Sequence, residues 1–344
     1  MKKPDAQTYI QGVLGRNRRM IAKAITLIES TLPADQETAR RILDAILPHT
    51  GKAVRLGITG LPGAGKSTFI ESFGTMLTEK GHCVAVLAVD PSSPKTGGSI
   101  LADKTRMEKL AVSERAFIRP SPSGGTLGGV ARKTRETMLL CEAAGFDVVM
   151  IETVGVGQSE VTVASMVDFF LVLMIAGGGD ELQGIKKGVL ELADAVVVNK
   201  ADGDNIERAN LARRQYEMAF HLLSPPSRNW TPPVVTCSSV TMAGLENILK
   251  IIFDHREKLI RSKEFRKKRQ QQDKDWLLFL LREGLQEWFY ENPAVANLLP
   301  QMMQEVEEGN RTPTSAAAKI LRCLSVGTAP EQSARRRQAI GGNT

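Results

Sequence analysis

The chain has 344 residues and a formal net charge of +7, with 42% hydrophobic and 24% charged residues. This composition is ordinary for a globular protein. No apolar run reaches the roughly 18 residues that a membrane-spanning helix needs, so we expect no membrane anchor. The basic start of the chain is not followed by the apolar core of a signal peptide, and we expect a cytoplasmic protein.

Positive charge gathers in two short stretches, residues 261–269 and 335–337. The first has the pattern of a solvated helix face, and the second lies in a polar tail. No nucleic-acid-binding signature accompanies them, so we expect no nucleic-acid partner. The cysteines form no Cys-x-x-Cys pair, which favours free thiols in a reducing compartment over disulfides or a zinc site. These cysteines are Cys83, Cys141, Cys237 and Cys323.

Residues 1–50 are expected to form a helical extension. Apolar residues recur at helical spacing between residues 21 and 28 and again between residues 42 and 46. The segment "STLPAD" divides the extension into two expected helices. We find no chemical motif in this region.

Short β-branched runs alternate with helical segments over residues 51–254. Strands that are apolar throughout are buried on both faces, and the helices between them imply right-handed crossovers. The pattern predicts an α/β domain with a mostly parallel sheet of about seven strands, flanked by helices. The expected strands are "VRLGIT", "CVAVLAVD", "AFIRP", "DVVMIE", "DFFLVLMI", "DAVVVNK" and "PVVTCSS".

The strands stop after residue 254, and residues 255–326 are expected to form a helical arm. Leu277, Leu281, Leu285 and Trp288 fall on one helical stripe. The arm has more apolar surface than a small appendage can bury, which suggests a subunit interface. Packing against the chain's own first helices explains the pattern equally well. Residues 327–344 have a composition typical of disorder.

The segment "GLPGAGKST" follows the first expected strand and opens a helix. It matches G-x-x-x-x-G-K-[ST], the P-loop, in which glycines let backbone N–H groups converge on phosphate oxygens. Lys66 is expected to reach the β- and γ-phosphates, and the Ser67 hydroxyl to bind Mg²⁺. The expected nucleotide-binding residues here are Gly60, Pro62, Gly63, Ala64, Gly65, Lys66, Ser67 and Thr68.

Asn199, Lys200 and Asp202 follow a buried strand and match N-K-x-D, the guanine-reading element of GTPases. The Asp202 carboxylate can accept from the ring N–H and the exocyclic amino group of guanine, whereas adenine offers neither donor. Lys200 is expected to lie along the base plane and Asn199 to brace the loops. Ser238 is expected to reach the guanine carbonyl oxygen through its backbone N–H, or else to be a plain helix N-cap.

Three carboxylates lie in loops at strand ends or between strands. Asp90 ends the second expected strand, Asp103 follows in a polar segment that contains glycines, and Glu152 ends "DVVMIE". Phosphoryl transfer needs Mg²⁺, neutralised charge and an aligned water. A helix N-cap is an open alternative for Asp103. The expected catalytic set is Lys66, Asp90, Asp103 and Glu152, and the expected metal ligands are Ser67, Asp90, Asp103 and Glu152.

Gly155 belongs to "ETVGVGQ", which reads E-x-x-G where many GTPases have D-x-x-G. Its N–H is expected to swing onto the γ-phosphate. The glycines and serines between Asp90 and Asp103 predict a segment that closes when nucleotide and metal bind.

Six segments together resemble the MeaB/ArgK family of P-loop GTPases. They are "GLPGAGKSTFIE", "AVDPSSPKTGGSILADKTRM", "FIRPSPSGGTLGG", "ETVGVGQSE", "AGGGDELQGIKKG" and "NKADGDN". The similarity runs from about residue 21 to about residue 254. It implies a P-loop NTPase fold, a C-terminal helical dimerisation arm, and GTP or GDP bound with Mg²⁺ at the residues named above.

The resemblance also implies partners. Family members gate the delivery of adenosylcobalamin to acyl-CoA mutases, chiefly methylmalonyl-CoA mutase, and protect the mutase. They are typically homodimers, and the cobalamin adenosyltransferase is a further candidate partner. Residues 177–188 resemble the family's third switch, although an ordinary strand–helix connection has a similar sequence.

Two alternative functions belong to other classes. A nickel or zinc metallochaperone GTPase needs a site rich in histidine or cysteine, which we do not find in the sequence. A kinase or transport-associated nucleotidase would use ATP, and the N-K-x-D element argues against ATP.

Overall fold

The computed structural model describes residues 3–89, 107–120, 127–153, 159–177, 187–220 and 227–325. The chain divides into two compact units, residues 1–272 and 273–344. The first unit contains the sheet. It extends beyond residue 254, the end expected from the sequence for the α/β domain, because α11 (Leu245–Arg261) packs into the core beside the sheet.

The sheet has seven strands, all parallel, as the sequence predicts. Their order is β3–β2–β4–β1–β5–β6–β7, so β1 lies at the centre. In parallel α/β sheets, ligands bind outside the carboxyl ends of the central strands. The strands are β1 (Val54–Gly60), β2 (Val84–Val89), β3 (Ala116–Arg119), β4 (Val148–Thr153), β5 (Phe169–Ile175), β6 (Ala195–Asn199) and β7 (Val234–Thr236).

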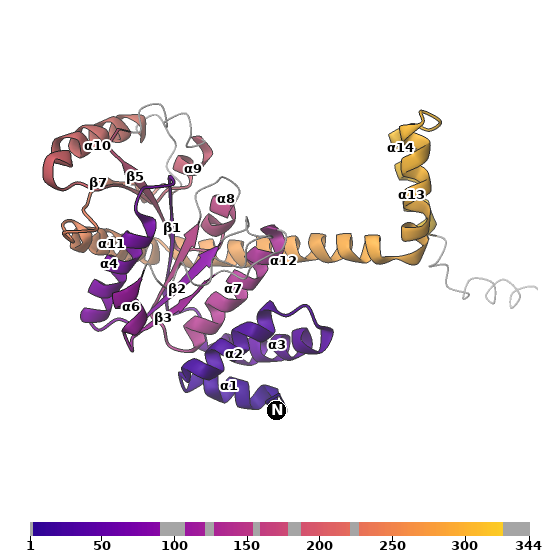
Figure 1. Ribbon diagram of the computed structural model, residues 1–344, viewed down its shortest axis with the longest axis horizontal. Helices are drawn as coiled ribbons and strands as arrows, with labels where there is room; N and C mark the ends of the chain where they lie inside the picture. The colour runs from indigo at the N-terminus through magenta and orange to yellow at the C-terminus, as the bar shows by residue number, and fades with distance from the viewer. Residues whose placement is uncertain are drawn as a thin grey trace, which may run out of the picture. The chain divides into compact units, whose positions relative to one another are not determined.

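Helices cover both faces of the sheet (Figure 1). On one face, α4 (Lys66–Glu79), α6 (Glu108–Val112) and α11 bury apolar side chains that include Phe69, Phe73, Ile248 and Ile252. On the other face, α7 (Leu127–Ala143) and α8 (Ser159–Ala164) pack against β1, β2 and β4. Two further described α-helices of the sheet region are α9 (Lys187–Glu191) and α10 (Ile206–Phe220).

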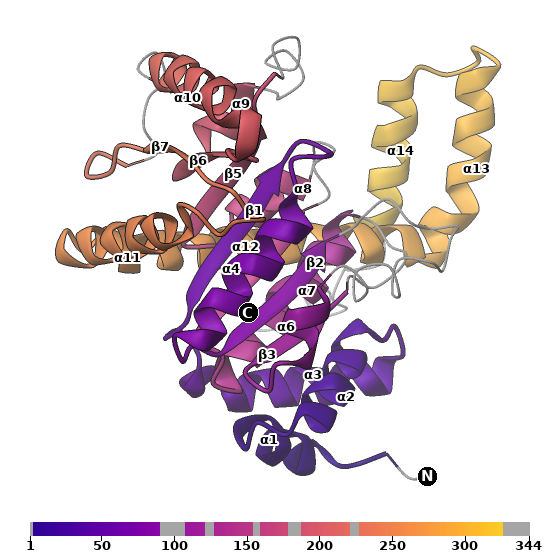
Figure 2. The same ribbon diagram turned by 60° about the vertical axis from the view of Figure 1, so that its left-hand side comes forward.

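In its described residues the N-terminal extension contains three α-helices, not the two expected, and they lie beside α7 (Figure 2). The helices are α1 (Ala6–Leu14), α2 (Arg18–Glu29) and α3 (Pro33–Ile46). The first break falls at Arg16, whose φ is 57°, and at Asn17, whose side chain accepts from Met20 N and caps α2. The sequence prediction missed this break because no proline marks it, and a capping asparagine is a weaker signal.

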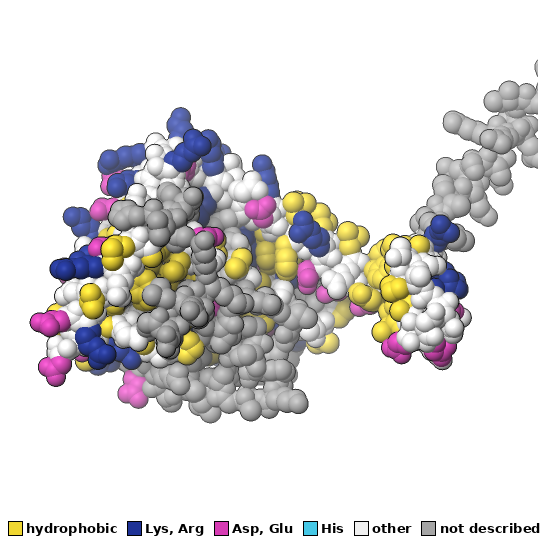
Figure 3. All heavy atoms as spheres, turned by 90° about the horizontal axis from the view of Figure 1, so that it is seen from above, with side chains coloured by type: hydrophobic (Ala, Val, Ile, Leu, Met, Phe, Trp, Pro, Cys, Tyr) yellow, Lys and Arg dark blue, Asp and Glu magenta, His cyan; other side chains and the backbone are white. Residues whose placement is uncertain are grey.

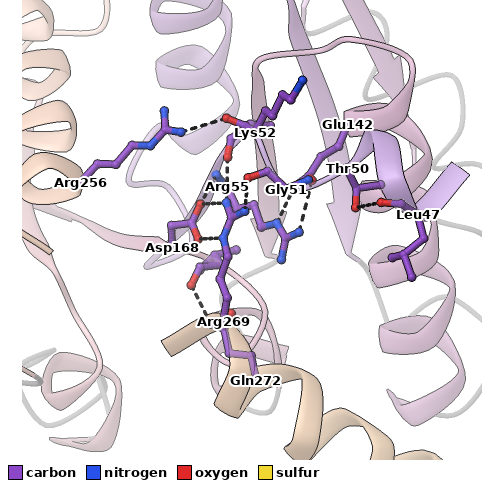
Figure 4. A network of polar contacts seen from close by, with 12 residues as sticks. Leu47, Thr50, Gly51, Lys52, Arg55, Glu142, Asp168, Arg256, Arg269 and Gln272 are labelled. Atoms are coloured by element: carbon purple, nitrogen blue, oxygen red, sulfur yellow. Dashed lines mark hydrogen bonds and ion pairs between the residues drawn. The ribbon is translucent and has the colours of Figure 1, made fainter. Parts of the chain in front are cut away.

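An ion pair anchors the start of α12 (Glu264–Glu291) to the amino-terminal edge of the sheet. Arg269 donates from Nε to Asp168 Oδ1 at 2.8 Å and from Nη2 to Asp168 Oδ2 at 2.6 Å. The same guanidinium reaches the carbonyl oxygens of Gly51 and Ala53. Asp168 Oδ2 also accepts from the Arg55 backbone N–H at 2.9 Å. Figure 4 shows how these groups converge.

A second buried ion pair lies beside the first. Arg55 Nε donates to Glu142 Oε1 at 2.5 Å, and Gly51 N donates to Glu142 Oε2 at 2.5 Å. The side chains of Arg55 and Glu142 are only 6% and 1% exposed. Buried charges persist only when they are paired, so the two ion pairs together hold the loop before β1 in one conformation.

The basic stretch at residues 261–269 is therefore not a solvated helix face along its whole length. Lys268 Nζ donates to Asp168 O at 2.7 Å and lies 3.5 Å from Asp194 Oδ2. Together with Arg269 it faces the sheet, whereas Arg266 is exposed. The sequence interpretation was wrong for Lys268 and Arg269 because their carboxylate partners lie far away along the chain.

The second unit is helical in the part that the structure describes. After α12 come α13 (Pro293–Glu307) and α14 (Pro313–Ser325), which pack around Val295, Met302, Ala316 and Ile320. Among the described residues, no helix is both long enough and apolar enough to span a membrane.

An apolar stripe runs along α12 and consists of Leu277, Leu281, Leu285 and Trp288. Each of these side chains is between 52% and 61% exposed. Figure 3 shows hydrophobic side chains at the surface of this helix. Such a contiguous apolar surface is typical of an interaction site.

We expect Arg269→Ala to destabilise the chain, because it leaves the buried Asp168 carboxylate without its guanidinium partner. The expected loss is about 3 kcal/mol in the free energy of unfolding, measured by urea denaturation. Arg266→Ala, an exposed arginine on the same helix, is the matched control. Equal losses in the two variants would contradict the anchoring role.

Candidate functional site

The loop between β1 and α4 has a backbone that favours glycine at two positions. Gly60 has a φ of 151°, and a Cβ there would lie 2.2 Å from Leu173 O. Gly65 has a φ of 85°, and a Cβ there would lie 2.8 Å from Asn199 Nδ2. The loop leads directly into the first turn of α4, where unpaired backbone N–H groups favour an anion. This geometry fits a phosphate-binding loop.

Lys66 begins α4 and is held by the loop itself. Its Nζ donates to Gly60 O at 2.8 Å and to Leu61 O at 3.2 Å. Burial lowers the pKa of the Lys66 ammonium, and the negative charges of Glu152 and Glu160 act in the opposite direction. The side chain is thus placed beside the loop with two carboxylates near it.

Ser67 and Glu152 meet between α4 and β4. The Ser67 hydroxyl donates to Glu152 Oε1 at 3.1 Å. Mg²⁺ prefers hard oxygen ligands of this kind, and one hydroxyl with one carboxylate beside a phosphate-binding loop fits a magnesium site. The structure therefore brings together two of the four metal ligands expected from the sequence.

Asn199, at the end of β6, connects the two loops of the site. Its Nδ2 donates to Ala64 O in the P-loop at 2.9 Å. Its Oδ1 accepts from Ser239 N at 3.1 Å, Ser239 Oγ at 2.8 Å and Cys237 Sγ at 3.3 Å. Burial raises the pKa of the Cys237 thiol to about 12, so the thiol keeps the proton that it donates. The bracing expected of Asn199 is present in the geometry.

Ser238 makes hydrogen bonds within the protein that were not expected from the sequence. Its hydroxyl donates to Asp202 Oδ2 and accepts from Thr241 N at 3.0 Å. Its backbone N–H donates to Ala243 O at 3.0 Å and is therefore already paired within the loop. Loop closure between Ser238 and Ala243 uses that N–H, which sequence spacing alone does not reveal. The side chain instead orients the Asp202 carboxylate.

Lys200 lies between Asn199 and Asp202 in the chain and has a positive φ of 61°, which is uncommon outside glycine. Asn205 Nδ2 donates to Lys200 O at 2.7 Å, and Ala201 N donates to Cys237 O at 2.9 Å. The bond from Ala201 holds the N-K-x-D turn against the loop after β7, and the bond from Asn205 closes the turn on the residues that follow it.

Some expected site residues lie outside the described residues, namely Asp90, Asp103 and Gly155. Most of the segment 177–188 also lies outside them. Sequence reasoning missed Ser239, although it belongs to the quoted run "PVVTCSS". It also missed Glu160, a buried carboxylate eight residues after Glu152 in "ETVGVGQSE".

Comparison with known proteins bears on this site. The family described as methylmalonyl-CoA mutase-associated GTPase MeaB matches residues 21–294, a range that contains the P-loop and the N-K-x-D turn. The chain belongs to the MeaB family. The resemblance seen in the sequence is thereby confirmed.

Individual proteins that are similar to this MeaB family member support the same assignment. GTPase ArgK of Escherichia coli is 50% identical over 303 residues, covering 88% of this chain and 92% of that protein. The mitochondrial methylmalonic aciduria type A homolog of Mus musculus is 45% identical over 323 residues, covering 91% and 78%. A crystal structure described as LAO/AO transport system kinase superposes with a TM-score of 0.76 at 40% identity, covering 94% and 99%.

We expect Asp202→Asn to change the preferred base. The carboxamide places a donor where guanine also presents donors, whereas xanthine presents a carbonyl oxygen. Guanine affinity should fall by about 10²-fold or more, and xanthosine diphosphate should bind better than GDP. Calorimetric titration of both nucleotides measures the change. Asp204→Asn, an exposed aspartate two residues on, is the control, and an unchanged guanine preference in Asp202→Asn would refute the base site.

Proposed function

We propose that this MeaB-family GTPase binds and hydrolyses GTP in order to gate the delivery of adenosylcobalamin to an acyl-CoA mutase of the methylmalonyl-CoA mutase type, which it also protects. The single observation that supports GTP binding is the set of hydrogen bonds that connects the P-loop with the loop after β7. Asn199 bonds Ala64 on the phosphate side and Ser239 on the base side, while Ser238 orients Asp202. These hydrogen bonds fix the loop proposed to bind the phosphates relative to the loop proposed to bind guanine.

In the proposed reaction, the P-loop N–H groups and Lys66 bind the β- and γ-phosphates. Lys66 Nζ exchanges its bonds to Gly60 O and Leu61 O for phosphate oxygens. Asp202 reads guanine, and Asn199 keeps its loop against the P-loop. The Glu152 carboxylate orients the attacking water at the end of β4.

Ser67 and Glu152 would hold Mg²⁺, which neutralises charge on the phosphates when it is bound. We retain Asp90 and Asp103 in the proposed catalytic and metal-binding set, on their positions in the sequence. Gly155 is proposed to meet the γ-phosphate.

The mutase partner is supported by the family description, which names a methylmalonyl-CoA mutase-associated GTPase. The name of the Mus musculus relative, a methylmalonic aciduria type A homolog, points to the same chemistry. We propose the cobalamin adenosyltransferase as a second partner, since it would supply the cofactor whose delivery is gated.

The mutase experiment uses the full chain and purified adenosylcobalamin-dependent methylmalonyl-CoA mutase. We expect the mutase to raise the GTP hydrolysis rate at least about tenfold, because a partner that orders catalytic loops stabilises the transition state. A CoA-dependent enzyme without cobalamin is the control. Hydrolysis that the mutase leaves unchanged would count against the chaperone function and would leave GTP binding standing.

We also propose that the protein is a homodimer in which a second copy covers the apolar stripe of α12. The support is the exposure of Leu277, Leu281, Leu285 and Trp288, each more than half exposed in one chain. An isologous interface on such a stripe would remove these side chains from water in both copies.

The dimer is tested by Leu285→Glu, which places a charge in the middle of the stripe. We expect the unchanged chain to sediment as a dimer and the variant as a monomer at micromolar concentration. Gln286→Glu adds the same charge to the neighbouring exposed position and should remain dimeric. A monomeric unchanged chain, or a dimeric Leu285→Glu variant, would contradict this interface.

A further inference from the structure

Two threonine hydroxyls meet in the interior where β1 and β4 approach the candidate site. Thr153 Oγ1 donates to Thr59 Oγ1 at 2.7 Å. Thr153 is 0% exposed and Thr59 is 1% exposed. Other side chains of both strands are mostly aliphatic. A hydroxyl buried in such surroundings is costly unless it is hydrogen-bonded, so the two groups depend on each other.

On each strand, the threonine of this pair is next to a residue of the candidate site. Thr59 directly precedes Gly60, the first glycine of the P-loop, and Thr153 directly follows Glu152. The strand register pairs Ile58 with Glu152, so the two threonines are the next pair along. They therefore connect the strand that carries the phosphate loop to the strand that carries the carboxylate.

Glu152 and Thr153 are held on opposite faces of the sheet. Side chains alternate along a strand, and Glu152 points to the α4 face, where Ser67 donates to it. Thr153 points to the other face, where α8 packs against β1 and β4. The end of β4 is thus bonded from both sides, and only one of the two bonds involves a residue of the proposed metal site.

We propose that Thr153 and Thr59 are positioning residues for GTP hydrolysis, whose hydroxyl–hydroxyl bond fixes Glu152 relative to the P-loop. The bond acts through the backbone of β4 and contacts neither nucleotide nor metal. Its removal changes the placement of the carboxylate and leaves the phosphate loop and the base site in place. The inference rests on the proposed GTP hydrolysis.

The first test compares Thr153→Val with Thr153→Ser in the full chain. Valine has nearly the same shape and lacks the donor, whereas serine keeps the hydroxyl. We expect kcat for GTP to fall roughly tenfold in Thr153→Val, with the dissociation constant for GDP changed by less than about twofold. Thr153→Ser should recover most of kcat. Thr59→Val should match Thr153→Val, and the double valine variant should be no slower than either, since all three lack one and the same bond.

Thr134→Val is the matched control. Thr134 is a buried threonine of α7 whose hydroxyl donates to Val130 O at 2.9 Å, a bond that stays within the helix. It should lose stability on a similar scale and keep its kcat. Equal kcat in Thr153→Val and Thr134→Val would overturn the inference, as would a fall in GDP affinity as large as the fall in kcat.

A second measurement does not depend on hydrolysis. Hydrogen exchange followed by mass spectrometry should show faster exchange in the peptide over residues 148–153 in Thr153→Val and Thr59→Val, but not in Thr134→Val. Unchanged exchange there overturns the positioning role. Absence of hydrolysis by the unaltered protein would instead overturn the proposed function, so the two failures are distinguishable.

Discussion

One carboxamide, that of Asn199, joins the two halves of the site. It donates to the P-loop at Ala64 and accepts three hydrogen bonds from the loop after β7. A buried amide with this many partners has one low-energy orientation, because any rotation leaves donors or acceptors unsatisfied. The distance between the phosphate loop and the base loop is thereby set before any ligand arrives, which reduces the ordering cost of binding.

The central strand β1 is held at both of its ends by different chemistry. At its start, the buried charges of Arg55, Glu142, Asp168 and Arg269 fix the preceding loop. At its far end, Thr59 supplies a neutral hydroxyl contact to β4. The ion pairs thus lie at the end of β1 that is opposite the P-loop, and the neutral hydroxyl bond lies at the end next to it.

Much of the fold was predictable from sequence because buried parallel strands leave local signals. All seven apolar runs became strands, and the P-loop glycines occupy backbone conformations that explain their spacing. The N-K-x-D turn was likewise identified from its sequence motif. The sequence did not predict the ion pairs between residues that lie far apart along the chain. Arg269 finds Asp168 at a sequence separation of 101 residues, and Lys268 lies near Asp194 at a separation of 74.

Side-chain roles within the site were only partly predictable for a related reason. Position identified Ser238, but its hydrogen bonds depend on how the loop to Ala243 closes. Thr59 and Thr153 look like ordinary strand residues, since threonine is common in sheets. Only the strand order, which places β4 beside β1, brings their hydroxyls together.

The thiol of Cys237 gives the loop after β7 a further chemical property. Thiol oxidation and alkylation proceed through the thiolate, and a pKa of about 12 leaves almost none of it at neutral pH. Within this loop the thiol is a hydrogen-bond donor to the Asn199 side-chain amide oxygen. Oxidants and electrophiles that modify acidic cysteines should therefore react only slowly with Cys237.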